Sequence, residues 1–251
     1  MIEERKKGKK KMKMRIAKFI ARSGACSRRE AEELIKQGRI TIDGNIVKEP
    51  AVNVDGSEKI LIDGEKLPQT QSTRLWLYHK PAGLVTSHKD EKNRPTVFDN
   101  LPSGLPRVIS VGRLDLNSEG LLLLTNSGEL SRKLELPSNG WVRRYKVRVF
   151  GNVRPEKLLL LQKGVVVDGV EYGSIKAEIE TRQGANTWLL VTLIEGKNRE
   201  IRKVMKYLGL EVSRLIRLSY GPFQLGSLKK GDVKEIPQKV LKEQLGKKFE
   251  L

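Results

Sequence analysis

The sequence predicts an α+β protein in two parts, a small N-terminal helix-hairpin module and a larger domain around a mixed, mostly antiparallel sheet. Two segments with helical periodicity, followed by two Asp-Gly hairpins, open the chain. After residue 75, alternating strand-like segments outnumber helical ones and are separated by hairpin-like turns. A polar stretch without periodicity, residues 68–74, lies between the two parts and predicts a linker.

Composition limits the classes of partner. The chain has 251 residues, 38% of them hydrophobic, and a net charge of +19, which predicts a polyanion such as RNA, DNA or an anionic membrane surface. No run approaches the ~18 apolar residues of a membrane span, and the first residues lack the apolar stretch of a secretory signal, so no membrane partner is expected. One cysteine and two histidines cannot form an intrachain disulfide or a Cys/His zinc site, so we expect a reducing cytoplasm.

The N-terminal part combines a basic tail with a compact module. Residues 1–13 are expected to be the tail, because residues 5–18 contain nine lysines and arginines and no acid. A solvated tail and a tail that lies on nucleic acid both fit. Residues 14–67 predict the module, in which one helix closes at a glycine and the next opens with a capping box between Ser27 and Glu30. Two hairpins follow, each with an Asp-Gly turn.

Basic side chains cluster on or beside the two predicted helices. An ordinary solvated face and a phosphate-binding face both fit this pattern, and the adjacent basic tail favours phosphate binding. The stretch "RIAKFIARSGACSRREAEELIKQGRITIDGNIV" resembles the small RNA-binding module first known from a small-subunit ribosomal protein, which implies RNA binding and not chemistry. The residues of the cluster are Arg22, Arg28, Arg29, Lys36 and Arg39.

Residues 75–237 predict the larger domain. The segment "LWLYHKPAGLVTS" indicates a strand, a Pro-Ala-Gly turn and a second strand, and "WVRRYKVRVFG" alternates as a half-exposed strand does. The segments "VEYGSIKAEIE" and "TWLLVTLIEG" predict further strands, whereas "NREIRKVMKYLG" predicts a helix that a glycine ends. Residues 238–251 are expected to be a basic C-terminal tail that could form a helix.

Missing motifs exclude several kinds of chemistry. The chain has no Gly-rich Lys-Ser/Thr phosphate loop, no GxGxxG after a strand and no GxSxG elbow. Nucleotide hydrolysis, dinucleotide redox chemistry and serine hydrolysis are therefore disfavoured. No DxD-like acid cluster stands out, which leaves a metal held only by carboxylates as an open alternative. Carboxylate chemistry in a basic setting, with few cofactor options, remains.

One acid stands out within "GRLDLNSEGLLLLTNSGEL", where Asp115 lies between Arg113 and four leucines. Turn formers at both ends predict a loop over residues 113–119. Asp115 could cap a turn or pair with Arg113. It could also be a nucleophile, because the positive field keeps it ionised and a partly buried carboxylate can attack an electron-poor sugar carbon or base.

Four segments, in order, resemble the pseudouridine synthases that modify ribosomal RNA and carry such a module in front. They are "HKPAGLVTS", "GRLDLNSEGLLLLTNSGEL", "RRYKVRVFG" and "LIEGKNREIRKVMKYLGLEVSRLIRLSYGPFQLGSLKKGDVKEI". With the N-terminal module, the resemblance spans about residues 14–236. It implies that a uridine in RNA is detached from its ribose, rotated and rejoined through carbon 5, without metal, nucleotide or redox cofactor.

The resemblance also implies roles for three residues. Asp115 would be the nucleophile, and Tyr145 would stack on the uracil and help to remove the carbon-5 proton. Arg202 would form the ion pair that keeps Asp115 charged and oriented. From the residues alone, Tyr145 would be a core aromatic residue and Arg202 a surface residue of a helix.

RNA contacts are expected around the reacting nucleotide. A base inside a helix cannot be rotated, so the nucleotide must be flipped out, which costs a few kcal/mol. By resemblance, Arg113 fills the gap that the nucleotide leaves. Lys80, Lys197 and Arg199 are expected to contact phosphates and help to offset that cost. Leu136 stands where many relatives carry histidine, a departure that concerns the choice of RNA site and not the chemistry.

The leading hypothesis is an enzyme that isomerises one uridine of ribosomal RNA, with large-subunit RNA preferred over small-subunit RNA. Its partner would be ribosomal RNA or a ribosomal precursor particle, and it would be a monomer. The alternative is a non-catalytic rRNA-binding or ribosome-assembly factor. An RNA hydrolase is disfavoured, because the sequence offers neither a plausible histidine base nor a metal cluster.

Overall fold

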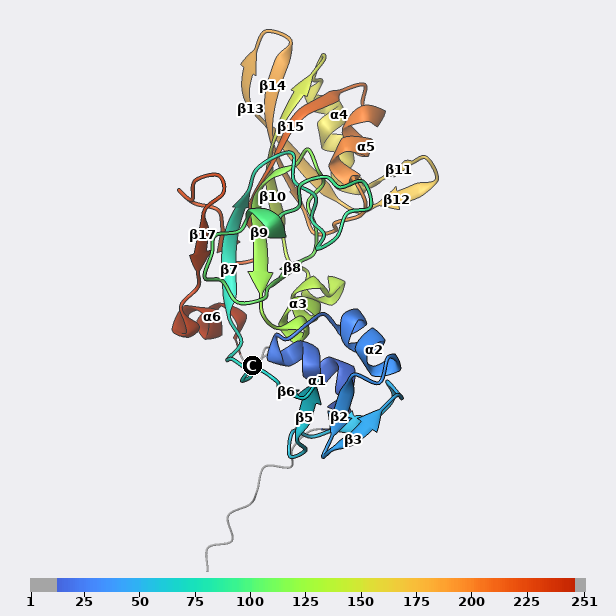
Figure 1. The fold of residues 1–251 in the computed structure, drawn as a ribbon. Coiled ribbons are helices and arrows are strands. Elements are labelled where there is room, and N and C mark those ends of the chain that lie inside the picture. The colour runs from blue at the N-terminus through green and yellow to red at the C-terminus, as the bar shows by residue number, and fades with distance from the viewer. Residues whose placement is uncertain (1–12, 247–251) are drawn as a thin grey trace, which may run out of the picture. The chain divides into compact units, whose positions relative to one another are not determined.

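The computed structural model describes residues 13–246 and divides into two compact units, Met1–Ser72 and Thr73–Leu251. Figure 1 traces the elements of each unit. The division falls within the stretch that was expected to be a linker. Of the predicted N-terminal tail, residues 1–12 lie outside the described part of the chain, as do residues 247–251.

The N-terminal unit packs two helices beside short strands. Its four-stranded sheet has the order β3-β2-β5-β6, and β1 pairs with β4. All these pairs are antiparallel. The elements are β1 (Met14–Arg15), α1 (Ile16–Ser23), α2 (Arg28–Lys36), β2 (Ile40–Ile42), β3 (Asn45–Val47), β4 (Asn53–Val54), β5 (Ile60–Ile62) and β6 (Glu65–Lys66).

Local sequence explains the elements of this unit. Helix α1 ends at Gly24, whose left-handed φ of 87° is open to glycine without a steric cost. Helix α2 begins with the predicted capping box. The Ser27 hydroxyl accepts a hydrogen bond from the Glu30 N–H at 3.1 Å, and the Glu30 carboxylate accepts one from the Ser27 N–H at 2.7 Å. Asp43 and Gly44 both have positive φ in the turn between β2 and β3, as a two-residue hairpin requires.

The second unit is built on one mixed sheet of nine strands. Its main path runs β13-β14-β10-β15-β9-β7-β17, with β8 beside β9 and β16 beside β15. The β15–β9 pair is parallel and the other pairs are antiparallel, which confirms the predicted mixed, mostly antiparallel sheet. A separate hairpin pairs β11 with β12.

The elements of this unit are more numerous than those of the first. Its strands are β7 (Leu75–Lys80), β8 (Ile109–Val111), β9 (Glu119–Thr125), β10 (Arg143–Phe150), β11 (Val165–Val167), β12 (Val170–Tyr172), β13 (Ile175–Gln183), β14 (Asn186–Leu193), β15 (Glu211–Tyr220), β16 (Phe223–Gln224) and β17 (Val233–Glu235). Its α-helices are α3 (Gly128–Glu135), α4 (Pro155–Leu160), α5 (Glu200–Tyr207) and α6 (Gln238–Leu245). Short 3-10 helices span Phe98–Asn100, Pro137–Asn139 and Leu161–Lys163.

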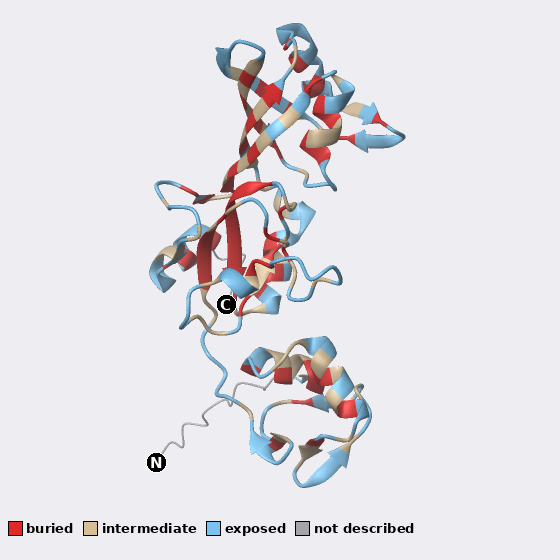
Figure 2. Cartoon of the chain, turned by 45° about the horizontal axis from the view of Figure 1, so that its top comes forward, coloured by how far each residue is buried: buried red, intermediate tan, exposed pale blue. Residues whose placement is uncertain are grey.

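The four-leucine run occupies β9, a strand that is buried along its whole length (Figure 2). Successive side chains of a strand point to opposite faces. Leu121 and Leu123 therefore join a core with α3 and α6, whereas Leu122 and Leu124 join a core under the long connection between β7 and β8. Because both faces are covered, the strand reads as an uninterrupted apolar run instead of an alternating one.

The other half of the sheet carries α4 and α5 on one face. Strands β10, β13, β14 and β15 supply alternating apolar residues to this core, and α5 adds Ile201, Val204 and Met205, which the sequence places on one side of a helix. These contacts fix α5 against β15 and so set the position of the segment that precedes it. Among residues 13–246, no helix is long and apolar enough to cross a membrane.

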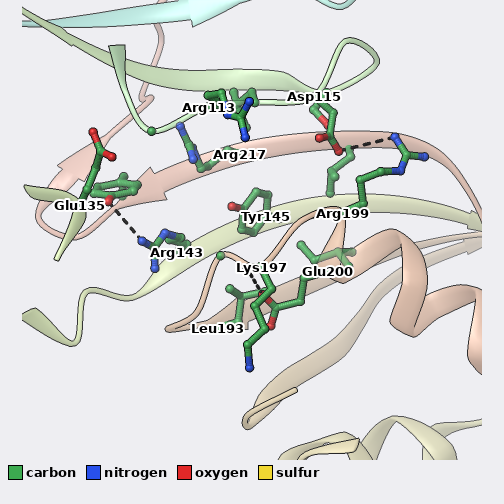
Figure 3. Close-up of a pocket in the computed structure, with 17 residues that line it drawn as sticks. Arg113, Asp115, Glu135, Arg143, Tyr145, Leu193, Lys197, Arg199, Glu200 and Arg217 are labelled. Carbon is green, nitrogen blue, oxygen red and sulfur yellow. Dashed lines mark hydrogen bonds and ion pairs between the residues drawn. The ribbon is translucent and has the colours of Figure 1, made fainter. Parts of the chain in front are cut away.

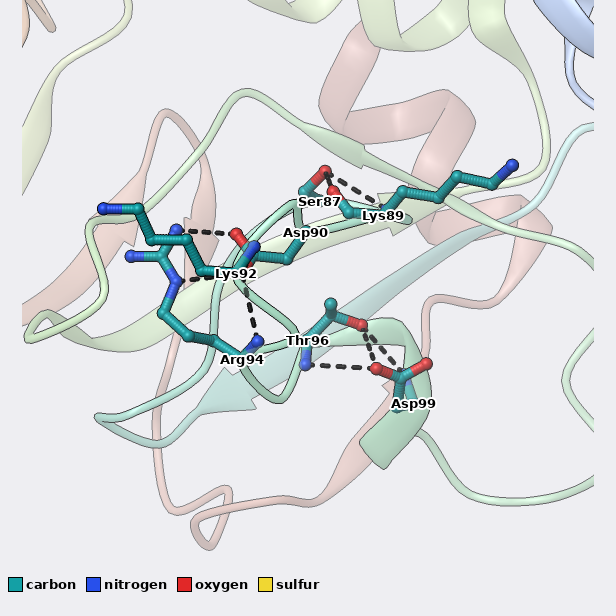
Figure 4. Close-up of polar contacts among 7 residues, drawn as sticks. All are labelled: Ser87, Lys89, Asp90, Lys92, Arg94, Thr96 and Asp99. Atoms are coloured by element: carbon teal, nitrogen blue, oxygen red, sulfur yellow. Dashed lines mark hydrogen bonds and ion pairs between the residues drawn. The ribbon is translucent and has the colours of Figure 1, made fainter.

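The connection between β7 and β8 is held by its own polar contacts (Figure 4). Arg94 donates from Nε and Nη2 to the two carboxylate oxygens of Asp90, at 3.0 and 2.6 Å, and lowers the pKa of Asp90. The Thr96 hydroxyl donates to Asp99 at 2.7 Å. The strand expected after the Pro-Ala-Gly turn does not form: a single bridge joins Val85 to Thr96, because the opposing segment turns into a 3-10 helix two residues later.

The expected C-terminal tail begins as a folded element. Helix α6 starts after Pro237, and its Leu241 and Leu245 are buried in the core that also contains Leu121 of β9. The apolar spacing of 241 and 245, four residues apart, lets one face of a short helix pack on the sheet. Residues 238–245 therefore belong to the second unit.

Candidate active site

A cavity of about 230 Å³ lies in the second unit, where the loop 112–118, strands β10 and β15, and the segment before α5 meet (Figure 3). It brings together five predicted site residues, Arg113, Asp115, Tyr145, Lys197 and Arg199. The other polar or charged residues that line it are Ser118, Glu135, Arg143, Glu200, Arg217 and Tyr220. Segments that are far apart in the sequence thus form one basic site.

Lys80 fixes the loop that carries Asp115. It is the last residue of β7 and is 0% exposed. Its Nζ donates to the carbonyl oxygens of Pro81 and Ser118, both at 2.9 Å, and of Asp115 at 3.2 Å. Burial lowers the pKa of Lys80 to about 8, and the Asp115 and Glu119 carboxylates oppose that shift. The expected phosphate contact of Lys80 is not possible in this structure, because the ammonium is enclosed by backbone carbonyls.

Other hydrogen bonds hold the same loop. The Thr86 hydroxyl donates to the Leu114 carbonyl at 2.9 Å, and the Gly83 N–H donates to the Leu116 carbonyl at 2.8 Å. Both donors come from the turn that follows β7. The residues on either side of Asp115 are therefore anchored to this turn, which orients the carboxylate before any substrate arrives.

The charge partner of Asp115 is Arg199, and the expected direct ion pair with Arg202 is not formed. Arg199 Nη1 lies 3.9 Å from Asp115 Oδ2. Arg202 uses its guanidinium for backbone carbonyls, donating to Val212 at 3.0 Å and to Asn117 at 2.9 Å. Burial lowers the pKa of Arg202, and the Asp115 charge opposes this shift. Arg202 thus tethers the loop two residues beyond Asp115, and its charge acts on the carboxylate from further away.

The segment before α5 shapes the lower wall of the cavity. Arg199 has a left-handed φ of 51°, which is uncommon for a residue with a side chain. Glu200 Oε2 accepts a hydrogen bond from the Lys197 N–H at 2.8 Å, whereas its buried Oε1 has no partner. Burial raises the pKa of Glu200. The Lys197 ammonium pairs with Glu195 at 2.8 Å and donates to the Glu171 carbonyl, so its phosphate contact stays a prediction.

Tyr145 lies on the sheet wall of the cavity. It is a buried residue of β10, and its cross-strand partners are Val191 on β14 and Arg217 on β15. Directly opposed residues share a face of the sheet, so Tyr145 and Arg217 line the cavity together. Arg143, two residues before Tyr145, donates to the Tyr220 hydroxyl at 3.2 Å.

The remaining predicted RNA-binding arginines lie in the N-terminal unit. Arg28 and Arg29 are the first residues of α2, and Arg22 is in the last turn of α1. Arg28 pairs with Glu32 at 3.5 Å, and the Arg39 guanidinium binds both carboxylate oxygens of Asp63. Their RNA contacts stay predictions.

Sequence reasoning missed several residues of the cavity. Arg143 could have been found, because the alternation of β10 places residues 143 and 145 on one face. Arg217 and Tyr220 carried no local signal, since their place beside Tyr145 depends on the β10–β15 register. In the described range 13–246, no group of three His, Cys, Asp or Glu side chains could hold a metal ion.

Comparison with known proteins matches each of the two units to a protein family. Residues 74–207 match the family described as RNA pseudouridylate synthase, and residues 14–60 match the S4 domain. The chain is 50% identical over 232 residues to an uncharacterized RNA pseudouridine synthase of Rickettsia prowazekii (strain Madrid E), which covers 92% of this chain and 97% of that relative. It is 42% identical over 217 residues to ribosomal large subunit pseudouridine synthase B of Yersinia pestis, covering 84% of this chain and 68% of that one.

A solved structure is also similar over most of the chain. It bears the description crystal structure of pseudouridylate synthase, and it matches with a TM-score of 0.64 and 27% identity. The match covers 93% of this chain and 100% of that one.

Proposed function

Because the chain belongs to the RNA pseudouridylate synthase family, we propose that it isomerises one uridine of ribosomal RNA with Asp115 as the nucleophile. The observation that carries the proposal is that Asp115 and Tyr145, from a loop and a distant strand, line the same cavity. A carboxylate and an aromatic ring in one cavity match what a flipped-out pyrimidine nucleotide needs, a nucleophile and a stacking surface.

The residues around the cavity have different roles in the proposed reaction. Asp115 attacks the ribose anomeric carbon or the base, and the Arg199 guanidinium, whose Nη1 lies 3.9 Å from Oδ2, interacts favourably with its negative charge. Tyr145 stacks on the uracil while it is detached and rotated. Arg113, which is exposed and lines the cavity, fills the gap that the flipped nucleotide leaves.

Lys80 and Arg202 act through the loop and not on the substrate. Lys80 binds the carbonyl groups of Ser118 and Asp115 itself, and Arg202 binds that of Asn117. Both are positioning residues, because a displacement of the nucleophile by 1 Å can cost ~10²-fold in rate.

The proposed substrate is RNA of the large ribosomal subunit. The Yersinia pestis relative, which is 42% identical, is named for that subunit. The S4 domain match and the arginines of α1 and α2 support RNA binding by the N-terminal unit. The proposed enzyme acts as a monomer in the cytoplasm, on ribosomal RNA or a precursor particle. Carbodiimide mapping of modified uridines in cells with and without the protein identifies the position.

The test of the nucleophile is tritium release from carbon 5 of labelled uridine in rRNA. Wild type should release tritium, and Asp115→Asn should release none, because an amide is a far weaker nucleophile. Asp168→Asn, in the exposed turn between β11 and β12, is the matched control and should keep the wild-type rate. Equal release by wild type and Asp115→Asn would refute the role of Asp115. Binding of rRNA with no release by wild type would show a binding factor instead of an enzyme.

A further inference from the structure

Arg217 is a buried guanidinium in the wall of the cavity that the reaction as proposed does not use. It is 3% exposed and is the cross-strand partner of Tyr145. Its Nε donates to the Leu121 carbonyl at 2.7 Å, whereas its Nη2 is buried and has no hydrogen-bond partner. Within residues 13–246, no carboxylate forms an ion pair with Arg217. In Figure 3, Arg217 and Asp115 lie to either side of Tyr145.

The backbone holds Arg217 in place. It pairs with Gly120 where β15 runs parallel to β9. Gly120 has a φ of 101°, and a Cβ at this position would lie 2.3 Å from the Arg217 carbonyl oxygen. The close approach of the two strands therefore requires glycine. The close approach of β9 and β15 and the hydrogen bond to the Leu121 carbonyl together fix the orientation of the Arg217 guanidinium, although no acid binds it within residues 13–246.

Arg217 also lies over the Tyr220 ring, 5.2 Å from its centroid, but within residues 13–246 it lacks the carboxylate or hydroxyl partner that the neighbouring arginines have. Arg199 pairs with Asp115, and Arg143 donates to the Tyr220 hydroxyl. Arg214, three residues before Arg217 on β15, binds the Glu119 carboxylate with two hydrogen bonds. Burial of a charge without a partner costs several kcal/mol, and such a group is retained where a ligand supplies the missing partner.

We propose that Arg217 donates a hydrogen bond to a carbonyl oxygen of the target uracil and stabilises the negative charge that develops on the base. This inference rests on the proposed function. The uracil stacked on Tyr145 presents its edge to the strand beside it, and Arg217 is the residue opposite Tyr145 on that strand. A donor that is already aimed at developing charge in a water-poor site lowers the barrier more than one that must reorganise.

The electron movements place negative charge on the base by either route. Attack of the Asp115 carboxylate at C1′ forms a C1′–O bond and breaks the C1′–N1 bond, whose electron pair stays on the uracil, spread over O2 and O4. Attack at C6 instead forms a C6–O bond and moves the C5–C6 electron pair toward the C4 carbonyl oxygen; on this route the C1′–N1 bond breaks as C5 bonds to C1′, and the Asp115 oxygen leaves from C6. The reaction ends when C5 bonds to C1′, the Asp115 oxygen leaves, the C5 proton is lost to a base and N1 gains a proton.

Depth favours the base over a phosphate as the ligand of Arg217. The Arg199 side chain is 52% exposed and Arg113 is exposed, so these two can meet phosphates, which stay hydrated near the surface. Arg217 is almost fully enclosed, so an uncharged uracil ring reaches it more readily than a hydrated phosphate does. Negative charge appears on that ring only during the reaction.

The test compares Arg217→Met and Arg217→Lys with wild type in single turnover, on RNA with uridine or 5-fluorouridine at the target position. The readout is loss of the N-glycosidic nucleoside after nuclease digestion. Fluorine stabilises the uracil anion, so a reaction with 5-fluorouridine depends less on Arg217. We expect the single-turnover rate of Arg217→Met to fall ~10²-fold on uridine, which is the usual effect of removing one such donor. On 5-fluorouridine the rate should fall only about tenfold. RNA affinity should change less than threefold.

Controls separate this role from folding and from the proposed function. Arg144→Met removes an exposed guanidinium from the residue next to Tyr145 and should react at the wild-type rate. Arg217→Lys keeps the positive charge but replaces the planar guanidinium with a single ammonium group. Its single-turnover rate should lie between those of wild type and Arg217→Met, and its unfolding midpoint should be close to that of wild type. Equal losses on the two substrates, or a tenfold weaker RNA affinity with a normal rate, would overturn the proposal and indicate a structural or phosphate-binding role. Failure of wild type itself to convert uridine would instead overturn the proposed function.

Discussion

Lys80→Met removes the ammonium under the nucleophile loop and keeps a side chain of similar length. In the wild type, Nζ lies 2.9 Å from the Pro81 and Ser118 carbonyl oxygens and 3.2 Å from that of Asp115. Nζ also lies 3.4 Å from the Leu116 carbonyl oxygen, so the three shorter contacts occupy the three donors of the ammonium group. The variant leaves all three carbonyls without this donor.

Two opposing effects determine how much Lys80→Met changes the free energy of unfolding. The pKa of Lys80 falls from 10.5 to about 8 in the folded protein, so the fold disfavours the charged form by about 3 kcal/mol, which methionine recovers. Each buried carbonyl that is left without a donor costs ~1–3 kcal/mol. The Asp115 carbonyl keeps the Ser118 N–H at 3.0 Å, so the cost falls on the carbonyls of Pro81 and Ser118 and is roughly 4 kcal/mol. The loss exceeds the gain, and we expect the free energy of unfolding of the second unit to fall by about 1 kcal/mol, with a melting temperature lower by roughly 2–4 °C.

Urea unfolding followed by tryptophan fluorescence measures this loss directly, because Trp76, Trp141 and Trp188 all lie in the second unit. Single-turnover tritium release should fall by at least ~10²-fold under conditions where the variant is still folded, since Asp115 is displaced. Lys163→Met, at an exposed position, is the control and should change neither quantity. Unchanged stability would refute the hydrogen-bond argument, and a normal rate in a destabilised variant would refute the positioning of Asp115 by Lys80.

Two further predictions concern the strand that follows the loop. Gly120→Ala should lower the free energy of unfolding by about 2–5 kcal/mol, because a methyl group would lie 2.3 Å from the Arg217 carbonyl at a φ of 101°; urea unfolding close to wild type would contradict it. The Arg214 and Lys230 side chains lower the pKa of Glu119 to about 2. A lowered carboxylate pKa stabilises the fold above pH 4.5, and this contribution, at most about 3 kcal/mol, is lost as the pH falls from 4.5 to 2. Glu119→Gln should therefore flatten the acid limb of the stability curve between these pH values, and an unchanged limb in urea titrations would exclude the effect.

The elements that sequence patterns predicted well are those with a local cause. The capping box of Ser27 and Glu30 and the helix stop at Gly24 depend on contacts within a few residues, and both occur as expected. The alternation of β10 and the one-sided apolar pattern of α5 likewise follow from the geometry of a single element. The strand expected near Val85 fails because its pairing depends on a segment that turns away.

The candidate site was predictable in part for the same reason. Asp115 and Tyr145 belong to motifs that can be read along the chain, and both line the cavity. Arg202 was expected to contact Asp115, but the turn before α5 brings Arg199 closer. A lysine in a motif does not reveal whether it faces solvent, and Lys80 is enclosed by a loop more than thirty residues away.

By itself, the amino-acid sequence determined the family, the division into two units, most helices and strands, and the acid on which the chemistry is proposed to depend. Tertiary structure alone decided which guanidinium meets that acid, which lysine is buried beneath it and which arginine stands beside Tyr145. The physical reason is the distance along the chain over which each interaction acts. Capping, turns and periodicity act between neighbours in the chain, whereas these three choices depend on strand register and on loops packed across the sheet, which no local pattern encodes.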